Sequence, residues 1–431
     1  MKLLLSAPFN SELNLSTFNA YVDVVNTIDE LHHIINDINE ESDNYDWKLS
    51  WEKPNANISL YRSLNDNYTP NASRPIIELK VNNTAWLKTN LSISLFETTG
   101  KNIDDLDIDF CTLYFYDNTI SILSLCIEDR GHHLSFADID DLTFDICNIL
   151  VTSFKPILQH MIHNLKRHPY FEAQQGNDEI FYKGNYSVYW VNRSLFINDS
   201  QYTRLETEIK KWCKFHTDDN ITHDYIDYKI IFCIGNNVII TEIEPYGTYI
   251  QSINMATYFY CLYFFINNRV SKIFEDIENI SLFEKNYKLL YKIERLVLFI
   301  DNKHQDIIFS LQGESKSITK HFYQVWGLEE IKSALNYKTS KVYELYKFER
   351  LQKTEKVGKI VQGTLTIIGA SAIIDVALNI IVFSHEDFNK SFYGFGPTYI
   401  INKINPDIVL LFSSIIIGWL AVIVFKEMTK K

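Results

Sequence analysis

The stretch IVQGTLTIIGASAIIDVALNIIVF, residues 360–383, decides the fold of this chain. As an α-helix rising about 1.5 Å per residue, it is long enough to cross the roughly 30 Å hydrocarbon core of a bilayer. A second apolar run, IVLLFSSIIIGWLAVIVF at residues 408–425, has a similar reach and carries no charged residue. The residues between them, 384–407, are largely polar and aromatic and include Pro and Gly. Such a segment would leave backbone N–H and C=O groups unpaired in lipid, so it must lie outside the membrane. The pattern predicts a C-terminal transmembrane hairpin with 384–407 as its outer loop.

Polar residues distinguish the first span from the second. Thr364, Ser371, Asp375 and Asn379 recur at helical spacing, with Ile368 among them, and so share one side of a helix. A carboxylate within a spanning helix is costly and indicates a functional site. We predict that these four residues line a pore, with Asp375 as a ring of carboxylates in a homo-oligomer, because two spans cannot enclose a channel. The alternative is that Asp375 and Asn379 hydrogen-bond between helices and hold an assembly together.

Lysines flank both spans on the side away from the loop: Lys353, Lys356 and Lys359 precede the first, and Lys426, Lys430 and Lys431 follow the second. Cytoplasmic flanks of membrane helices carry an excess of Lys and Arg. The charge pattern therefore predicts a multi-pass protein of the inner (cytoplasmic) membrane with both termini in the cytoplasm.

Residues 1–280 are predicted to form an α+β cytosolic body. The opening apolar residues predict a first strand, and apolar residues at helical spacing predict a helix over 17–40. Short β-rich pieces follow at 48–51, 58–61, 76–81 and 91–96, then a hairpin at 110–116 and 119–127 and a long helix at 135–167. Hydrophobic residues make up 46% of the chain, enough for a buried core.

The second half of the body repeats this order of elements. A hairpin is predicted at 187–191 and 194–197, a helix at 204–214, another hairpin at 229–234 and 238–242, and a helix at 252–279. A hairpin followed by a long helix thus occurs twice, at 110–167 and 229–279, which suggests an internal repeat.

Residues 281–359 are predicted to form a helical stalk. Leu328, Leu335 and Val342 recur every seven residues, as in the seam of a coiled coil. From Ile318 onward the pattern is compatible with one helix that runs into the first span. A continuous helix over residues 325–383 would be on the order of 90 Å long and could transmit a movement from the body to the membrane.

Composition and motifs exclude several functions. A net charge of −13 argues against nucleic-acid binding, which relies on Lys and Arg. The six cysteines have no C-x-x-C spacing and are predicted to be reduced core residues. His160 and His163 have a spacing found in zinc sites, but no further ligands accompany them, so surface histidines are favoured. No motif of a nucleotide-hydrolysing or serine-hydrolase enzyme occurs; we predict no catalytic residue, no metal site and no enzyme.

Residues 246–265 are unusually aromatic, with Tyr258, Phe259 and Tyr263 among them. Such a helix typically belongs to a core or an interface. An alternative is that some of these rings stack on the base of a nucleotide ligand, as aromatic platforms do. The pattern does not identify the residues of a ligand pocket.

A large cytosolic α/β body, a very long helix entering the first of two C-terminal spans, and both termini inside resemble the CorA-type cation channels. The resemblance is architectural and covers mainly residues 280–431. It implies a pentamer whose first spans line a cation pore; in that family, selection of Mg²⁺ depends on the Asn of a Gly-Met-Asn signature in the outer loop. The Gly-Met-Asn signature of that family is absent; this chain has Tyr393-Gly394-Phe395-Gly396 at the corresponding place.

A chain with the CorA outline but without this signature resembles the divergent CorA-like membrane effectors that accompany type III CRISPR systems. That resemblance implies an antiviral role, in which a nucleotide messenger such as SAM-AMP opens the channel and permeabilises the inner membrane. Two alternatives remain: a constitutive divalent-cation (Mg/Co) transporter, and a membrane-anchored binding or scaffold protein for which the hairpin is only an anchor.

Overall fold

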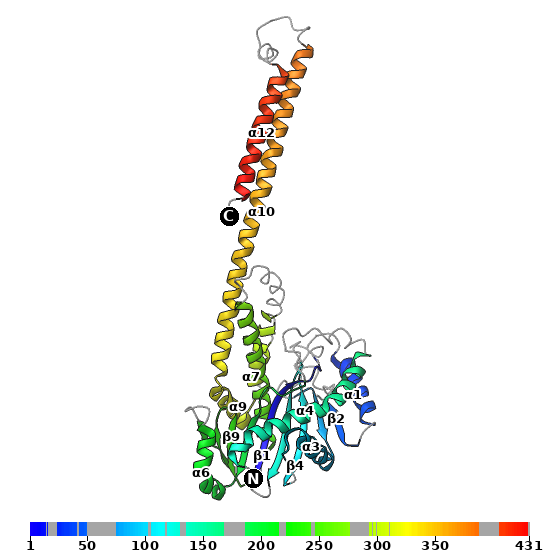
Figure 1. The fold of residues 1–431 in the computed structure, drawn as a ribbon, viewed down its shortest axis with the longest axis vertical. Coiled ribbons are helices and arrows are strands. Elements are labelled where there is room, and N and C mark those ends of the chain that lie inside the picture. Colours follow the sequence, from blue (N-terminus) through cyan, green and yellow to red (C-terminus); the bar gives the residue numbers. More distant parts are fainter. Residues whose placement is uncertain are drawn as a thin grey trace, which may run out of the picture. The chain divides into compact units, whose positions relative to one another are not determined.

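The computed structural model divides into two compact units, residues 1–339 and 340–431. The structure describes residues 1–13, 15, 24–40, 43–49, 75–101, 105–116, 119–129, 135–167, 186–214, 221–242, 246–275, 293–294, 296–298, 300–309, 311–387 and 405–429. Figure 1 colours their helices and strands in chain order. The predicted boundaries at residues 280 and 359 stay predictions.

The described part of the first unit contains a nine-stranded mixed sheet in the order β2-β3-β4-β5-β1-β6-β9-β8-β7. Its strands are β1 (Lys2–Asn10), β2 (Tyr45–Leu49), β3 (Ile77–Val81), β4 (Leu106–Phe115), β5 (Ile120–Asp129), β6 (Asn192–Ile197), β7 (Ile221–Asp224), β8 (Tyr228–Phe232) and β9 (Asn236–Thr241). Neighbouring strands are antiparallel except β6 and β9, which are parallel. The predicted first strand, β1, lies at the centre between β5 and β6.

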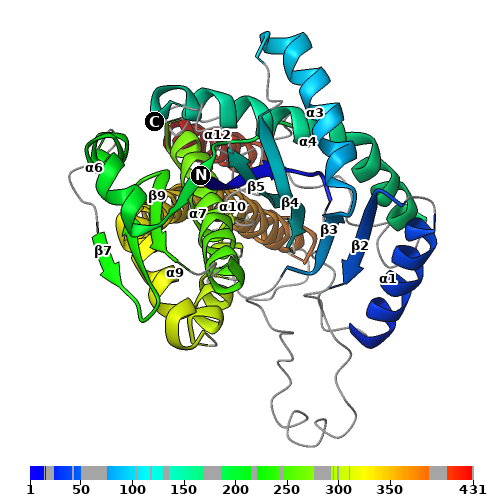
Figure 2. The same cartoon turned by 90° about the horizontal axis from the view of Figure 1, so that it is seen from below.

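Helices cover both faces of this sheet: α1 (Val24–Asn39), α3 (Thr84–Thr99), α4 (Phe136–Lys166), α6 (Asp199–Lys214), α7 (Tyr246–Glu275) and α9 (Gly313–Val325). Leu5 and Phe9 of β1 belong to the core cluster that includes α4. Ser6 instead donates a hydrogen bond to Asn254 Oδ1 of α7 at 2.7 Å. Because successive side chains of a strand point to opposite faces, α4 and α7 lie on opposite faces of the sheet, as Figure 2 shows.

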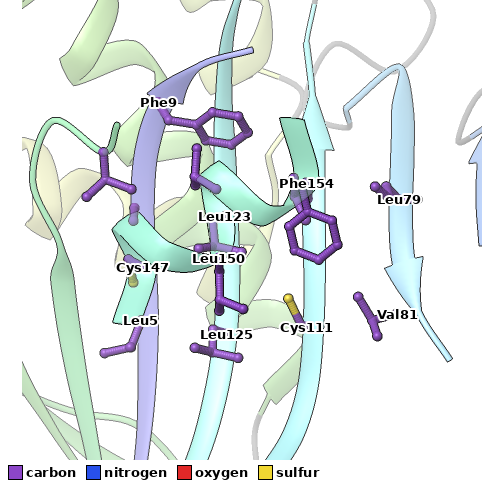
Figure 3. Packing of buried hydrophobic residues seen from close by; sticks show 14 of the residues in the cluster. Leu5, Phe9, Leu79, Val81, Cys111, Leu123, Leu125, Cys147, Leu150 and Phe154 are labelled. Carbon is purple, nitrogen blue, oxygen red and sulfur yellow. The ribbon is translucent and has the colours of Figure 1, made fainter. Parts of the chain in front are cut away.

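The core beneath α4 consists of fully buried aliphatic and aromatic side chains. Figure 3 shows strand residues packed against one side of this helix: Leu5, Phe9, Cys111, Leu123 and Leu125 opposite Cys147, Leu150 and Phe154. All six cysteines lie in the described part, are buried, and form no disulfide. The expectation of reduced core cysteines agrees with these positions.

Several predicted elements are present. The hairpins β4–β5 and β8–β9 and the helices α4, α6 and α7 lie where the periodicity placed them, and both hairpins are followed by a long helix. Ser135 caps α4, its Oγ accepting from the Asp138 backbone amide, and Pro156 lies inside that helix. The internal repeat stays a prediction. The predicted strand at 58–61 lies outside the described residues.

Three sequence predictions are wrong. Residues 91–96 are not a strand but part of α3, because Asn83 caps that helix and Leu87, Leu91 and Leu95, four residues apart, all face the core. Residues 187–191 form no hairpin strand; β6 begins at Asn192, and the preceding segment makes only an isolated bridge between Val188 and Phe9.

The third wrong prediction concerns the stalk. The chain is not one helix from Ile318, because Gly327 adopts the left-handed conformation (φ 64°) between α9 and the next helix. That helix, α10 (Leu328–Asp387), has 60 residues and is about 90 Å long. Leu328, Leu335 and Val342, the predicted heptad positions, are fully buried within the single chain. They therefore do not form a free seam for another copy.

The last described helix is α12 (Pro406–Thr429). Among the described residues, α10 has one stretch, Leu328–Val376, that is long and apolar enough to cross a membrane. In α12 the apolar stretch is shorter, Leu411–Ile423. The transmembrane hairpin stays a prediction.

Candidate functional site

The four predicted pore residues lie together on α10. Thr364, Ser371, Asp375 and Asn379 are all exposed in the single chain. The Thr364 hydroxyl donates to the carbonyl of Ile360, four residues earlier, at 2.9 Å, so it is satisfied within the helix. The structure thus agrees with the helical spacing that placed these side chains on one side.

A different stripe of the same helix is partly covered. It consists of residues at the same helical spacing, shifted by one position along the chain: Gly363, Ile367, Ala370, Ile374 and Leu378. One position corresponds to about 100° around the helix axis. The contacts within the chain therefore involve the apolar stripe and leave the polar stripe, which we call the Asp375 stripe, uncovered.

Large apolar side chains around α10 are also uncovered. Leu365, Ile368, Ile373 and Val376 are each 58–72% exposed. An apolar surface of this extent marks contact with a membrane or with other protein chains. The predicted outer-loop residues Tyr393, Gly394, Phe395 and Gly396 lie outside the described residues.

The first unit contains a cavity of about 420 Å³ where the segment before α9, α9 itself and the start of α10 meet. We call it the His304 cavity. Its lining residues are His304, Gln305, Ile308 and Phe309; Lys320, Tyr323 and Gln324 of α9; and Glu329, Glu330 and Lys332 of α10. The volume lies within the range of about 300–1,000 Å³ that small-molecule sites occupy.

His304 is enclosed by aromatic rings. Its ring centroid lies 5.0 Å from that of Phe259, 5.8 Å from Tyr263 and 5.0 Å from Tyr323. Burial, and to a smaller extent the nearby Lys332 ammonium, lower the pKa of His304 from 6.5 to about 4. The imidazole is therefore neutral at pH 7.

Two buried polar atoms of the cavity walls are left without partners. Neither His304 Nε2 nor Tyr323 Oη has a hydrogen-bond partner among the described residues, although the two residues are only 4% and 6% exposed. Burial also raises the pKa of Tyr323 far above its usual value, so its hydroxyl keeps its proton. Buried polar atoms in folded proteins are nearly always paired, and these two are exceptions that the protein itself covers.

Charged groups of both signs surround the His304 cavity. Lys320 is exposed, and Lys332 Nζ lies 3.6 Å from Glu329 Oε1 and 5.6 Å from the centre of the Tyr263 ring. Tyr263 Oη donates to Asp301 Oδ1 at 2.5 Å, which holds the ring beside His304. The cavity thus combines aromatic rings with charged groups of both signs.

The histidines weighed as zinc ligands are not brought together with other ligands. In the described part of the chain, no group of three His, Cys, Asp or Glu side chains could hold a metal ion.

Sequence reasoning missed the His304 cavity because its walls come from three separate segments. The only signal was the aromatic run of residues 246–265, whose members Phe259 and Tyr263 pack against the His304 ring.

Comparison with known proteins found no matching family model, no matching curated protein and no matching solved structure.

Proposed function

We propose that this chain is the subunit of a ligand-gated ion channel of CorA-like build in the inner membrane. The observation that carries the proposal is the Asp375 stripe, a line of polar side chains left uncovered on a helix whose surroundings are apolar. In lipid, exposed Asp and Asn side chains are expensive, so they must face protein or water. Copies of α10 around a common axis would let these side chains face neighbouring subunits and a water-filled pathway.

The proposed assembly is a homo-oligomer, with five subunits as in the CorA-type channels. One chain offers a single α10 and so cannot surround a pathway, whereas a ring of α10 helices places the Asp375 carboxylates around it. A ring of carboxylates favours cations. The lysine-rich flanks of both apolar runs support cytoplasmic termini and an outer loop at 384–407.

The proposed trigger is a nucleotide messenger, with SAM-AMP as the leading example from the resemblance to CRISPR-associated effectors. Support comes from the cavity in the body, which is of ligand size and is lined by aromatic and charged side chains. A ligand that binds one state of the body more tightly than the other shifts the population of open channels. Opening would dissipate ion gradients and stop the growth of an infected cell.

Ion flux from liposomes tests the channel. We expect purified full-length protein to release K⁺ after addition of SAM-AMP, and the variants Asp375→Ala and Asn379→Ala to change that flux at least several-fold. Ile373→Ala is the matched control, because Ile373 is 72% exposed on the same helix but lies away from the stripe. Unchanged flux in both stripe variants would contradict the assignment of these residues to the pore.

The same assay separates the alternatives. Flux of Mg²⁺ without any nucleotide would support a constitutive transporter instead. Full biological activity after the two spans are exchanged for an unrelated two-span anchor would support a scaffold protein.

A further inference from the structure

In the described part of the chain, β7 is an edge strand of the sheet, and α9 packs against the β7–β8 hairpin at this edge. Two side-chain hydrogen bonds connect the hairpin to α9. Tyr228 Oη donates to Glu314 Oε2 at 3.0 Å, and Tyr225 Oη donates to Ser317 Oγ at 3.2 Å. Glu314, Ser317 and His321 recur at helical spacing, so they share the side of α9 that meets the hairpin.

A third contact on this side of α9 is made by two histidines. The ring centroid of His321 lies 4.5 Å from that of His223 of β7 and 5.1 Å from that of Phe232 of β8. His223 also packs against the ring of Tyr225, with centroids 4.6 Å apart. Both imidazoles are half-buried. We call His223 and His321 the histidine pair.

Two imidazoles at this separation repel each other strongly when both are protonated. Burial, and to a smaller extent the neighbouring His223, lower the pKa of His321 below its usual 6.5, so the packed arrangement favours the neutral ring. When the hairpin and α9 are apart, each imidazole has the ordinary pKa near 6.5 and takes up a proton in mildly acidic solution. The separated arrangement therefore binds more protons than the packed one.

The charges around the histidine pair do not offset this repulsion. The charged side chains of β7, β8, their turn and α9 are Asp224, Asp227, Lys229, Glu314, Lys316 and Lys320. Asp224 and Lys229 form an ion pair at 3.4 Å, and strand alternation places both on the opposite face of the hairpin from His223. The Glu314 carboxylate accepts from Tyr228, two helical turns from His321. The helix α7, which also packs against α9, carries no charged side chain before Arg269.

We infer that the histidine pair is an acid-sensitive contact, which holds the edge hairpin on α9 at neutral pH and releases it in mildly acidic solution. This response does not depend on the channel proposal, because it follows from ring contacts within the body. It reaches the long helix through the chain itself, since α9 is followed directly by Gly327 and α10.

The direction of the response follows from proton uptake. Below about pH 6.5 the separated arrangement takes up protons first, because the pKa of His321 is lowered in the packed one. The packed arrangement is therefore fully favoured above pH 6.5 and becomes less favoured as the pH falls through the lowered pKa.

Hydrogen–deuterium exchange of the full-length protein in detergent tests the contact, with mass spectrometry at about pH 7.5 and about pH 5. Rates are corrected for the intrinsic pH dependence of amide exchange. We expect amides of the hairpin, residues 221–232, and of α9 to be accelerated about ten-fold more by acid than those of the central strands β1 and β5. The central strands report global unfolding, which includes the effect of His304.

His321→Phe and His223→Phe each keep an aromatic ring that cannot take up a proton. Either variant should reduce the extra acceleration of the hairpin and α9 from about ten-fold to about two-fold or less, whatever its rate at neutral pH. The matched control is His163→Phe, because His163 is exposed on α4 and should leave the ratio between the two pH values unchanged.

Two outcomes overturn the assignment. One is equal acceleration of the hairpin and the central strands by acid in the unaltered protein, which would leave only global unfolding. The other is an acid response of the hairpin that persists at full size in both His321→Phe and His223→Phe, which would place its origin at other groups.

Discussion

Lys338 of α10 donates a hydrogen bond to Ser271 Oγ of α7 at 2.7 Å, and the same ammonium donates to Asn267 Oδ1 at 3.0 Å. A partly buried cation with two neutral partners holds the first turns of α10 against the aromatic helix that supports His304. Because hydrogen bonds that involve a charged group are stronger than neutral ones, this pair of bonds should attach α10 firmly to α7.

Replacing this lysine should loosen the attachment. Lys338→Met keeps the aliphatic stem and removes the charge, and we expect it to lower the free energy of unfolding by about 1–2 kcal/mol. The control is Lys341→Met, whose ammonium bonds to Glu344 on the exposed side of the same helix and should matter by less than about 0.5 kcal/mol. Thermal unfolding in detergent, followed by tryptophan fluorescence, measures both; equal shifts would contradict the assignment.

Glycine is required at residue 327 but not at residue 358. Gly327 has φ 64°, and a Cβ there would lie 3.2 Å from Glu330 Oε2, so Gly327→Ala should cost about 1–2 kcal/mol. Gly358 lies inside α10 with nothing near its Cβ position, and Gly358→Ala should stabilise the protein by about 0.5–1 kcal/mol. Opposite signs in the same unfolding assay are expected; a neutral Gly327→Ala would refute the role of the left-handed turn.

Acid should destabilise the body through His304. Its pKa is about 4 in the folded chain and 6.5 when exposed, so the unfolded state takes up the proton first as the pH falls. Stability is therefore complete above pH 6.5 and decreases between pH 6.5 and 4, by on the order of 3 kcal/mol from this group. His304→Phe should flatten the stability profile in that window relative to the unaltered protein. Parallel profiles of the two proteins from pH 7 to 4 would show that His304 is not buried as described.

The buried heptad positions should behave as core residues of a single chain. Leu335 is fully buried, and Leu335→Ala should cost about 2–5 kcal/mol, while Leu345→Ala, at a side chain that is 41% exposed, should cost far less. The shift for Leu335→Ala should also not depend on protein concentration. Concentration-dependent unfolding that Leu335→Ala abolishes would instead place the heptad in an interface between copies.

Local patterns predicted much of the fold. Turn residues between two apolar runs identified β4–β5 and β8–β9, and long amphipathic stretches identified α4 and α7. The failures have a common cause. Residues 91–96 have the composition of a strand, but they form part of a helix, because Asn83 caps its start and Leu87 and Leu91 are buried along one side. The break at Gly327 is a single dihedral angle that periodicity does not record.

The sequence by itself determined the long apolar helix and its line of polar residues, because length, hydropathy and a 3.6-residue period are properties of a continuous segment. Only the tertiary structure decided that Leu335 is used within the chain, that the Asp375 stripe stays uncovered, and that His304 and Tyr323 meet in one cavity. Burial and pairing depend on neighbours from distant segments. The burial of His304 and the turn at Gly327 are therefore properties of the folded chain, set by distant neighbours and by backbone angles.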